Sequence, residues 1–298
     1  MAHKLRAAMH EPISYFQAIV LGLVQGVAEP FPISSLGHGV VLPRLFGWNI
    51  HQNDAYFLTF LVATHIGTSL VLLFFFLKDW IKIVKGVFRS IAIREIRDDD
   101  VYARLGWVLI VGTIPAGILG LTLEKPLRSL FASASLAAIF LIVNGVALLF
   151  FERLRGRPPR PGDGLGDSDA RIARMSWRSA IEVGSSQAAA LIPGISRSGF
   201  AMGGGLVSGL SNEDAARYAF LLATPIIFAA GALKLPELLG TQGNGVRGQA
   251  LVGGICAAVT TYFAIRFLLK YFQTNRLTPF GIYCIAMGSL CTVVFALQ

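Results

Sequence analysis

The chain has 298 residues, of which 54% are hydrophobic and only 14% are charged. Soluble domains carry about 25% charged residues, so the composition argues against a soluble protein. Apolar stretches of about 18 residues or more, enough to cross a bilayer, recur along the chain. The net charge of +9 does not indicate a nucleic-acid partner, because the basic residues lie between the apolar stretches as the positive-inside rule predicts. We therefore expect an all-α polytopic membrane protein that lies in a bilayer.

Six apolar segments qualify as full transmembrane helices, in chain order about 55–77, 105–123, 134–151, 214–238, 248–270 and 278–297. Two further segments, about 13–46 and 178–208, are long enough to span but are interrupted by proline and glycine. Proline removes a backbone donor, glycine weakens a helix, and unpaired backbone is not tolerated in lipid. We expect each interrupted segment to be a re-entrant helical hairpin that is shielded inside the protein. The cysteines fall in predicted spans without ligand spacing and are expected to be buried packing residues: Cys256, Cys284 and Cys291.

The two interrupted segments carry near-copies of one motif, QGVAEPFPISSLGH (25–38) and SSQAAALIPGISRSG (185–199). An offset of 162 positions aligns identical residues: Gly22 with Gly184, Gln25 with Gln187, Ile33 with Ile195, Ser34 with Ser196, and Gly37 with Gly199. A second match, DAYFLTFLVAT (54–64) with DAARYAFLLAT (214–224), has an offset of 160. The same pattern at 184–199 argues that the N-terminal apolar stretch is not a cleaved signal peptide.

These matches predict one membrane domain, 1–298, built of two repeats, about 13–151 and 178–297. Each repeat contains one hairpin and three spans, and three is odd, so the second repeat starts on the opposite side of the membrane. This is an inverted-topology repeat, and its two hairpins should meet near the midplane. Two spans separate the arginine- and lysine-rich segments 78–104 and 152–178, which we expect to be connecting loops, so both should face the cytoplasm. Both termini are then outside, and 152–177 is a cytoplasmic linker whose stretch 156–169 is rich in Gly, Pro and Asp.

Glu29 and Arg197 lie in segments that should avoid charge, which makes them candidates for a functional site. Arg197 offers a planar fork of donors for a phosphate group. Ser35 or His38 could act as the nucleophile, and the sequence leaves open which of them does. Glu29 could act as general base, orient the histidine or hold a divalent cation.

The residues around these four could bind an anion through backbone N–H groups and hydroxyls at helix N-termini. The expected substrate-binding residues are Gln25, Ser34, Gly37, Ser196, Ser198 and Gly199. Simpler roles remain open, since Glu29 could only lock the two hairpins together through Arg197, and His38 could be structural. For Gln187 we favour an inter-helix hydrogen bond over contact with a ligand.

Three sequence patterns resemble the bacterial undecaprenyl-diphosphate phosphatases, also called bacitracin-resistance proteins. They are (E/Q)xxxE from Gln25 to Glu29, PxSSxGH at 32–38 and PGxSRSG at 193–199, and the resemblance extends over nearly the whole chain. It implies hydrolysis of undecaprenyl diphosphate to undecaprenyl phosphate and inorganic phosphate within the membrane. This reaction recycles the lipid carrier for peptidoglycan synthesis and confers bacitracin resistance.

The resemblance also implies roles for single residues. Glu29 is the acidic residue, Ser35 and His38 are the candidates for nucleophile or proton transfer, and Arg197 binds the diphosphate. The family usually needs Mg²⁺ or Ca²⁺, with Glu29 as a candidate ligand, and its site opens to the outer side of the cytoplasmic (inner) membrane. Gln25 leaves one negative charge where other members have two, which weakens the case for a metal held by this pair.

The main alternative is a secondary transporter or lipid flippase for an anionic substrate, because inverted repeats with broken helices are typical of transporters. Such a protein needs Arg197 and helix ends, but not a serine and a histidine beside a glutamate. A non-catalytic membrane scaffold is a third alternative. The expected partner is a polyprenyl diphosphate lipid, and the sequence leaves room for a homodimer.

Overall fold

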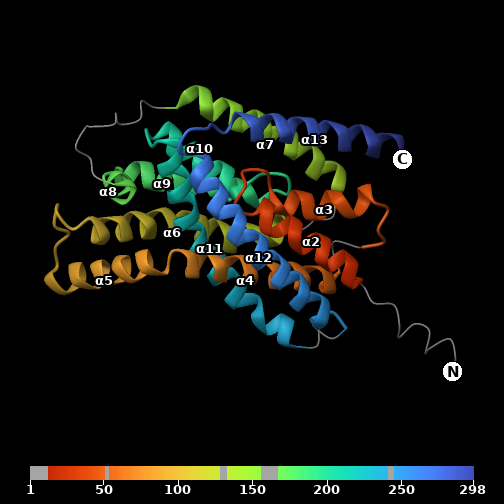
Figure 1. The fold of residues 1–298 in the computed structure, drawn as a ribbon, viewed down its shortest axis with the longest axis horizontal. Coiled ribbons are helices and arrows are strands. Elements are labelled where there is room, and N and C mark those ends of the chain that lie inside the picture. Colours follow the sequence, from red (N-terminus) through yellow and green to blue (C-terminus); the bar gives the residue numbers. More distant parts are fainter. Residues whose placement is uncertain (1–12, 51–53, 128–132, 156–166, 241–244) are drawn as a thin grey trace.

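A computed structural model describes residues 13–50, 54–127, 133–155, 167–240 and 245–298 of the chain, and every regular element in these ranges is helical (Figure 1). Six helices in these ranges are long and apolar enough to cross a membrane: α4 (Ala55–Phe75), α6 (Val101–Leu127), α7 (Ala134–Leu154), α11 (Asn212–Leu239), α12 (Arg247–Tyr271) and α13 (Thr278–Leu297). These six helices confirm the six predicted spans and the all-α, multi-pass class.

Both interrupted segments consist of two helices with a non-helical break. In the first, α2 (Tyr15–Ala28) ends just before Pro30, and α3 (Ser35–Leu45) begins after a run of turns. In the second, α9 (Trp177–Ser186) passes into a 3₁₀ turn, η2 (Gln187–Leu191), and α10 (Arg197–Val207) follows. Proline lacks the N–H that a helix needs, so each break lies where the sequence predicts it. The two helices of each segment pack on one another.

Each interrupted segment is packed against a span from the other half of the chain. α2 lies on α12, and α9 lies on α6. The contacts are close because glycine has no Cβ: a Cβ at Gly22 would lie 2.4 Å from the Gly253 carbonyl oxygen, and one at Gly184 would lie 2.0 Å from that of Gly112. α4 packs on α11, and α7 lies beside α13 along the upper edge of Figure 1. The two halves are therefore interleaved rather than side by side.

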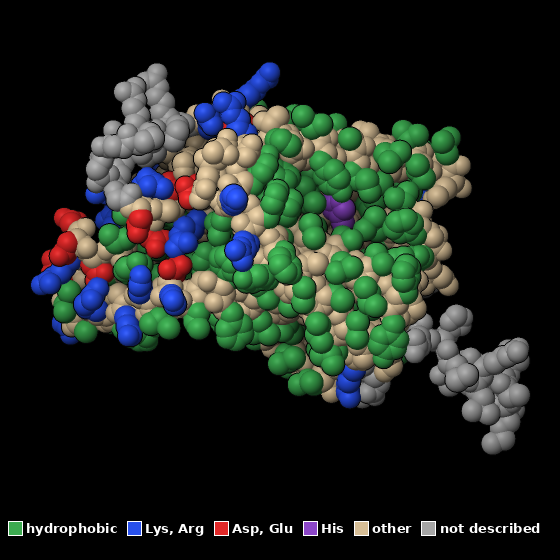
Figure 2. Space-filling view, viewed as in Figure 1, with side chains coloured by type: hydrophobic (Ala, Val, Ile, Leu, Met, Phe, Trp, Pro, Cys, Tyr) green, Lys and Arg blue, Asp and Glu red, His purple; other side chains and the backbone are tan. Residues whose placement is uncertain are grey.

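Charged side chains gather at one end of the molecule, where α5 (Leu77–Ile93) and α8 (Ser168–Ala173) lie, whereas hydrophobic side chains cover most of the remaining surface in view (Figure 2). Ion pairs tie this end together. Arg217 on α11 contacts Asp79 at 2.8 Å and Asp169 at 2.7 Å, and Arg171 contacts Asp214 at 2.7 Å. The helices α5 and α8, which come from the two basic segments of the sequence, thus share one end of the fold.

One expectation about this end needs correction. Segment 78–104 was expected to be a connecting loop, but most of it is the helix α5, which lies against α6. Its basic residues alternate with apolar residues at helical spacing that remain exposed: Ile81, Val84, Phe88 and Ile91. A helix with this pattern suits the boundary between lipid and water. Of the expected linker stretch 156–169, residues 156–166 lie outside the described part of the chain.

The cysteines follow their prediction only in part. Cys284 and Cys291 on α13 are fully buried, but Cys256 on α12 is half-buried. Cys284 accepts a hydrogen bond from Asn144 of α7 across the helix pair. The two buried thiols therefore act as packing groups between α7 and α13.

Candidate active site

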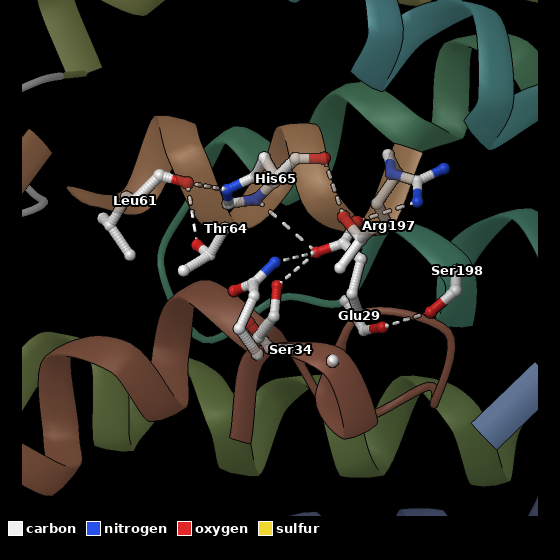
Figure 3. A network of polar contacts seen from close by, with 12 residues as sticks. Glu29, Ser34, Leu61, Thr64, His65, Arg197 and Ser198 are labelled. Atoms are coloured by element: carbon white, nitrogen blue, oxygen red, sulfur yellow. Dashed lines mark hydrogen bonds and ion pairs between the residues drawn. The ribbon is translucent and has the colours of Figure 1, made fainter. Parts of the chain in front are cut away.

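Glu29 and Arg197, the two charged residues of the motifs in the interrupted apolar segments, meet at the junction of the two breaks (Figure 3). Nη2 of Arg197, the first residue of α10, donates to Oε1 of Glu29 at 2.9 Å. Glu29 follows directly after α2, and its side chain is 8% exposed, against 16% for Arg197. Removing one partner of a buried ion pair costs about 3–5 kcal/mol, because the other charge stays uncompensated. The pair therefore fixes the two breaks against each other, and its partners are 168 positions apart in the chain.

The second carboxylate oxygen of Glu29 accepts a hydrogen bond from the hydroxyl of Ser35. Ser35 Oγ lies 2.5 Å from Glu29 Oε2, and Gln25 Nε2 donates to the same oxygen from 3.1 Å. A serine whose proton is directed at a buried carboxylate has the geometry of a nucleophile paired with a general base.

His65 also faces Glu29, although the sequence analysis did not select it. Its Nε2 lies 3.5 Å from Glu29 Oε2, and its Nδ1 lies 2.8 Å from the carbonyl oxygen of Leu61, one turn earlier on α4 (Figure 3). The signal was present, because an ionisable residue inside an apolar span is itself a functional candidate. His65 also directly follows the repeated stretch 54–64.

His38 has other partners than this network. Its Nδ1 is 2.8 Å from the carbonyl oxygen of Ser34, and its Nε2 is 2.8 Å from the Tyr283 hydroxyl of α13. The two rings are stacked with centroids 5.8 Å apart. His38 is buried and is not among the residues that line the cavity at Glu29. The structure thus brings together Glu29, Ser35 and Arg197, but does not bring His38 to them.

A cavity of about 520 Å³ lies against this network and combines a polar region with apolar walls. Its polar lining includes Glu29, Ser34, Ser35, His65, Gln187, Ser196 and Arg197. The walls come from α4, α6 and α11 through residues such as Leu61, Ala116 and Ile227. Such a cavity suits an amphiphile whose anionic group meets the arginine while its apolar part lies along the walls.

The remaining predicted binding residues mainly shape the two breaks. Ser34 Oγ accepts from the backbone N–H of Gly37, and Ser196 Oγ accepts from that of Gly199, both at 3.1 Å. These serines are the N-caps of α3 and α10 and both line the cavity, so two positive helix ends lie at the cavity with the same capping hydrogen bond. Ser198 instead donates to the carbonyl oxygen of Phe31 at 2.8 Å.

A buried asparagine on α7 holds the two breaks in contact. Asn144 donates through Nδ2 to the carbonyl oxygen of Pro32 at 3.0 Å and accepts from the backbone N–H of Ser196 at 2.9 Å. One side chain thus satisfies backbone groups of both non-helical segments. This pairing fits the requirement that irregular backbone at membrane depth be bonded inside the protein.

The prediction of an inter-helix hydrogen bond for Gln187 was wrong. Neither Nε2 nor Oε1 of this buried residue has a hydrogen-bond partner among the described residues, and the same holds for Nη1 of Arg197. An unsatisfied buried polar group costs about 1–3 kcal/mol. Both residues line the cavity, so these three unsatisfied atoms belong to its lining residues.

Within the described ranges, no group of three His, Cys, Asp or Glu residues is arranged to hold a metal ion. Glu29 is the one carboxylate in the described lining of the cavity. Mg²⁺ is often held by one or two carboxylates together with substrate phosphates rather than by a protein cage. The residues therefore fit a divalent cation only if Glu29 and a bound phosphate group coordinate it together.

Comparison with known proteins places the chain in a family. The model of the family described as Bacitracin resistance protein BacA matches residues 18–290. Among its relatives, a protein of Mycolicibacterium paratuberculosis named undecaprenyl-diphosphatase is 46% identical over 96% of this chain and 99% of its own length. Proteins named undecaprenyl-diphosphatase 2 from Frankia alni and Burkholderia orbicola are 41% and 43% identical, over 97% and 96% of this chain and 100% and 99% of their own lengths. The chain belongs to the bacitracin resistance protein family.

Proposed function

We propose that this protein hydrolyses undecaprenyl diphosphate to undecaprenyl phosphate and inorganic phosphate, and so recycles the lipid carrier of peptidoglycan synthesis and confers bacitracin resistance. The observation that carries this proposal is the hydrogen bond of Ser35 to Glu29, at 2.5 Å, beside Arg197 in a partly apolar cavity. The names of the relatives agree with it. A prenyl diphosphate is an amphiphile of the kind that this cavity suits, with its tail in the lipid.

We assign Ser35 as the nucleophile towards the terminal phosphorus and Glu29 as the base that receives its proton. Prenyl phosphate leaves in this step, and water then attacks the phosphoserine. Glu29 returns its proton to Ser35, and the two protons of the water leave with phosphate as H₂PO₄⁻. Arg197 and the N-termini of α3 and α10 offset the charge of the diphosphate. The hydrogen bond between His38 and Tyr283 favours a structural role for this histidine rather than attack on phosphorus.

A divalent cation, Mg²⁺ or Ca²⁺, is part of the proposal. Glu29 would hold it together with the diphosphate, and it would supply a Lewis acid that offsets charge on the phosphoryl oxygens. Glu29 already accepts from Arg197 and Ser35, so the same carboxylate would have to serve both the cation and the proton of the serine.

We further propose that the domain 1–298 is an inverted-topology repeat of about 13–151 and 178–297, with two re-entrant hairpins joined by the cytoplasmic linker 152–177. Three observations support it: the exchanged packing of α2 on α12 and α9 on α6, the close contacts of Gly22 and Gly184, and the matching caps Ser34 and Ser196. The charged end with α5 and α8 would then face the cytoplasm. The protein would lie in the bacterial inner membrane with its termini and active site on the outer side, and a homodimer remains part of the hypothesis.

A transporter or flippase is the alternative, and nothing in the names of the relatives favours it. Phosphate release in detergent separates the two functions, because no compartment exists there and transport cannot produce free phosphate. We expect the purified protein to release inorganic phosphate from undecaprenyl diphosphate in detergent. The release should stop with a chelator and return with added Mg²⁺ or Ca²⁺.

We expect Arg197→Ala to lower kcat/KM in this assay by on the order of 10²–10³-fold, because a preorganised donor to the phosphoryl group is lost. Arg178→Ala is the matched control, since this arginine lies on the same segment with its side chain 88% exposed. It should keep wild-type activity. Equal release by wild type and Arg197→Ala would overturn the proposed function.

A further inference from the structure

Gln187 is a buried amide at the cavity whose hydrogen-bonding groups are unused. Its side chain is 3% exposed and belongs to the first residue of the 3₁₀ turn η2. Both Nε2 and Oε1 lack a partner within the part of the chain that the structure describes. The residue lines the same cavity as Glu29, Ser35 and Arg197.

The equivalent glutamine of the first repeat shows what a structural amide does at this position. Gln25, 162 positions earlier, donates through Nε2 to Glu29 Oε2 at 3.1 Å. It is not among the residues that line the cavity. At Gln187 the corresponding acidic residue is missing, because Leu191 stands where the first repeat has Glu29. The second repeat thus keeps the glutamine but has lost its internal partner.

A second unpaired group points to the nature of the missing partner. Nη1 of Arg197 is also buried and without a partner among the described residues, while Nη2 of the same guanidinium is bonded to Glu29. The unused atoms are therefore two donor nitrogens and one acceptor oxygen. A phosphoryl group offers acceptor oxygens only, so it satisfies both nitrogens, and a water molecule satisfies the amide oxygen.

We propose that Gln187 is a substrate-binding residue of the diphosphate site. Its Nε2 donates to a phosphoryl oxygen together with Nη1 of Arg197, and its Oε1 accepts from a water molecule beside the phosphoryl group. Because Nη2 of Arg197 is held by Glu29, this second anchor fixes the phosphoryl group on the side of the guanidinium that faces away from the carboxylate. The assignment rests on the proposed function for the identity of the substrate, but not for the binding of an anion.

The decisive variant is Gln187→Met, which has about the same size but neither donor nor acceptor. We expect it to keep or raise the melting temperature of the unliganded protein, because replacing an unsatisfied amide by an apolar group of the same shape removes a cost. We expect kcat/KM for undecaprenyl diphosphate to fall about tenfold or more, with a rise in KM. Gln249→Met is the matched control, since Gln249 is equally buried at 3% but lies on α12 outside the cavity lining, and its kcat/KM should not change.

A second variant and a second probe keep the inference testable if Gln187→Met does not fold. Gln187→Glu retains the size and an acceptor but loses the donor, and its carboxylate repels phosphate, so its KM should rise at least as much. Inorganic pyrophosphate should raise the melting temperature of the wild type, and the shift should shrink in both variants.

An unchanged kcat/KM together with an unchanged pyrophosphate shift overturns the assignment. A lowered melting temperature with unchanged kcat/KM overturns it as well, and shows that the amide has a structural role. If the wild type releases no phosphate, the proposed function fails, and the pyrophosphate shift alone decides whether Gln187 binds a phosphoryl group.

Discussion

The two interrupted segments have the same framework but contribute different chemistry. In both, a serine caps the second helix through the N–H three residues later, at 3.1 Å. The offset of 162 places Ser35 opposite Arg197, and these equivalent residues bind the two oxygens of one carboxylate, Glu29. The first segment supplies the acid and the hydroxyl, and the second supplies the positive charge.

This difference explains how one repeated motif can form a single asymmetric site. Two identical segments would place like groups against each other, either two carboxylates or two guanidinium groups, at a depth where charge is costly. Replacement of the acidic residue by Leu191 and of the serine by Arg197 makes the pair complementary instead. It also leaves Gln187 without the carboxylate that its equivalent, Gln25, binds.

The largest expected effect tests whether Ser35 and His38, three positions apart in one motif, have different roles. Ser35→Ala should lower kcat for phosphate release by about 10³-fold or more, because the nucleophile is lost while Glu29 and Arg197 stay paired. His38→Ala should have a smaller effect, because it removes a contact with Tyr283 outside the cavity. Phosphate release and melting temperature of both variants give the measurement.

The same comparison has a clear contrary result. If His38→Ala loses as much turnover as Ser35→Ala at an unchanged melting temperature, the histidine must reach the substrate in a conformation other than this one. The proposed assignment of the nucleophile to Ser35 would then be wrong.

Much of this fold follows from the sequence because membrane spans and helix breaks have strong local signals. Length and apolar composition predict all six spans, and proline and glycine predict both breaks. The helix α5 was missed because its charges suggest a loop, although its apolar residues recur at helical spacing. Local patterns also place Ser35 and His38 in one motif, but they cannot tell that Ser35 bonds to Glu29 whereas His38 bonds to Tyr283.

The parts of the site that the sequence did not predict depend on contacts between distant segments. His65 comes from a span, and only packing of α4 brings it 3.5 Å from Glu29. Gln187 is unpaired because no described residue packed around it supplies a hydrogen-bond partner, and no pattern within 185–199 can reveal this. The repeat did predict the meeting of Glu29 and Arg197, because equivalent segments of an inverted repeat should converge.

An intermediate effect is expected at the two glycines that let the segments approach the opposite half. Gly22→Ala and Gly184→Ala should each destabilise the protein by about 1–3 kcal/mol, because the added methyl meets a backbone oxygen that cannot move freely. Gly117→Ala on α6 is the control, since a Cβ there has nothing within 4 Å. It should be neutral or stabilising, because alanine favours the helix. Thermal unfolding in detergent without substrate measures all three, and stable variants at both Gly22 and Gly184 would argue against the exchanged packing.

The smallest expected effect separates the two capping serines, which share a hydrogen bond but not a backbone conformation. Ser34 has a positive φ of 68°, whereas Ser196 has a φ of −91°. Alanine at either position loses the cap, at about 1 kcal/mol, and glycine loses less. At position 34 glycine should also relieve the strained φ. Ser34→Gly should therefore be more stable than Ser34→Ala, and this difference in stability should exceed the difference between Ser196→Gly and Ser196→Ala by about 1 kcal/mol. Equal differences in melting temperature at the two positions would show that the backbones of the two caps are alike, and that the asymmetry of the site lies in its side chains alone.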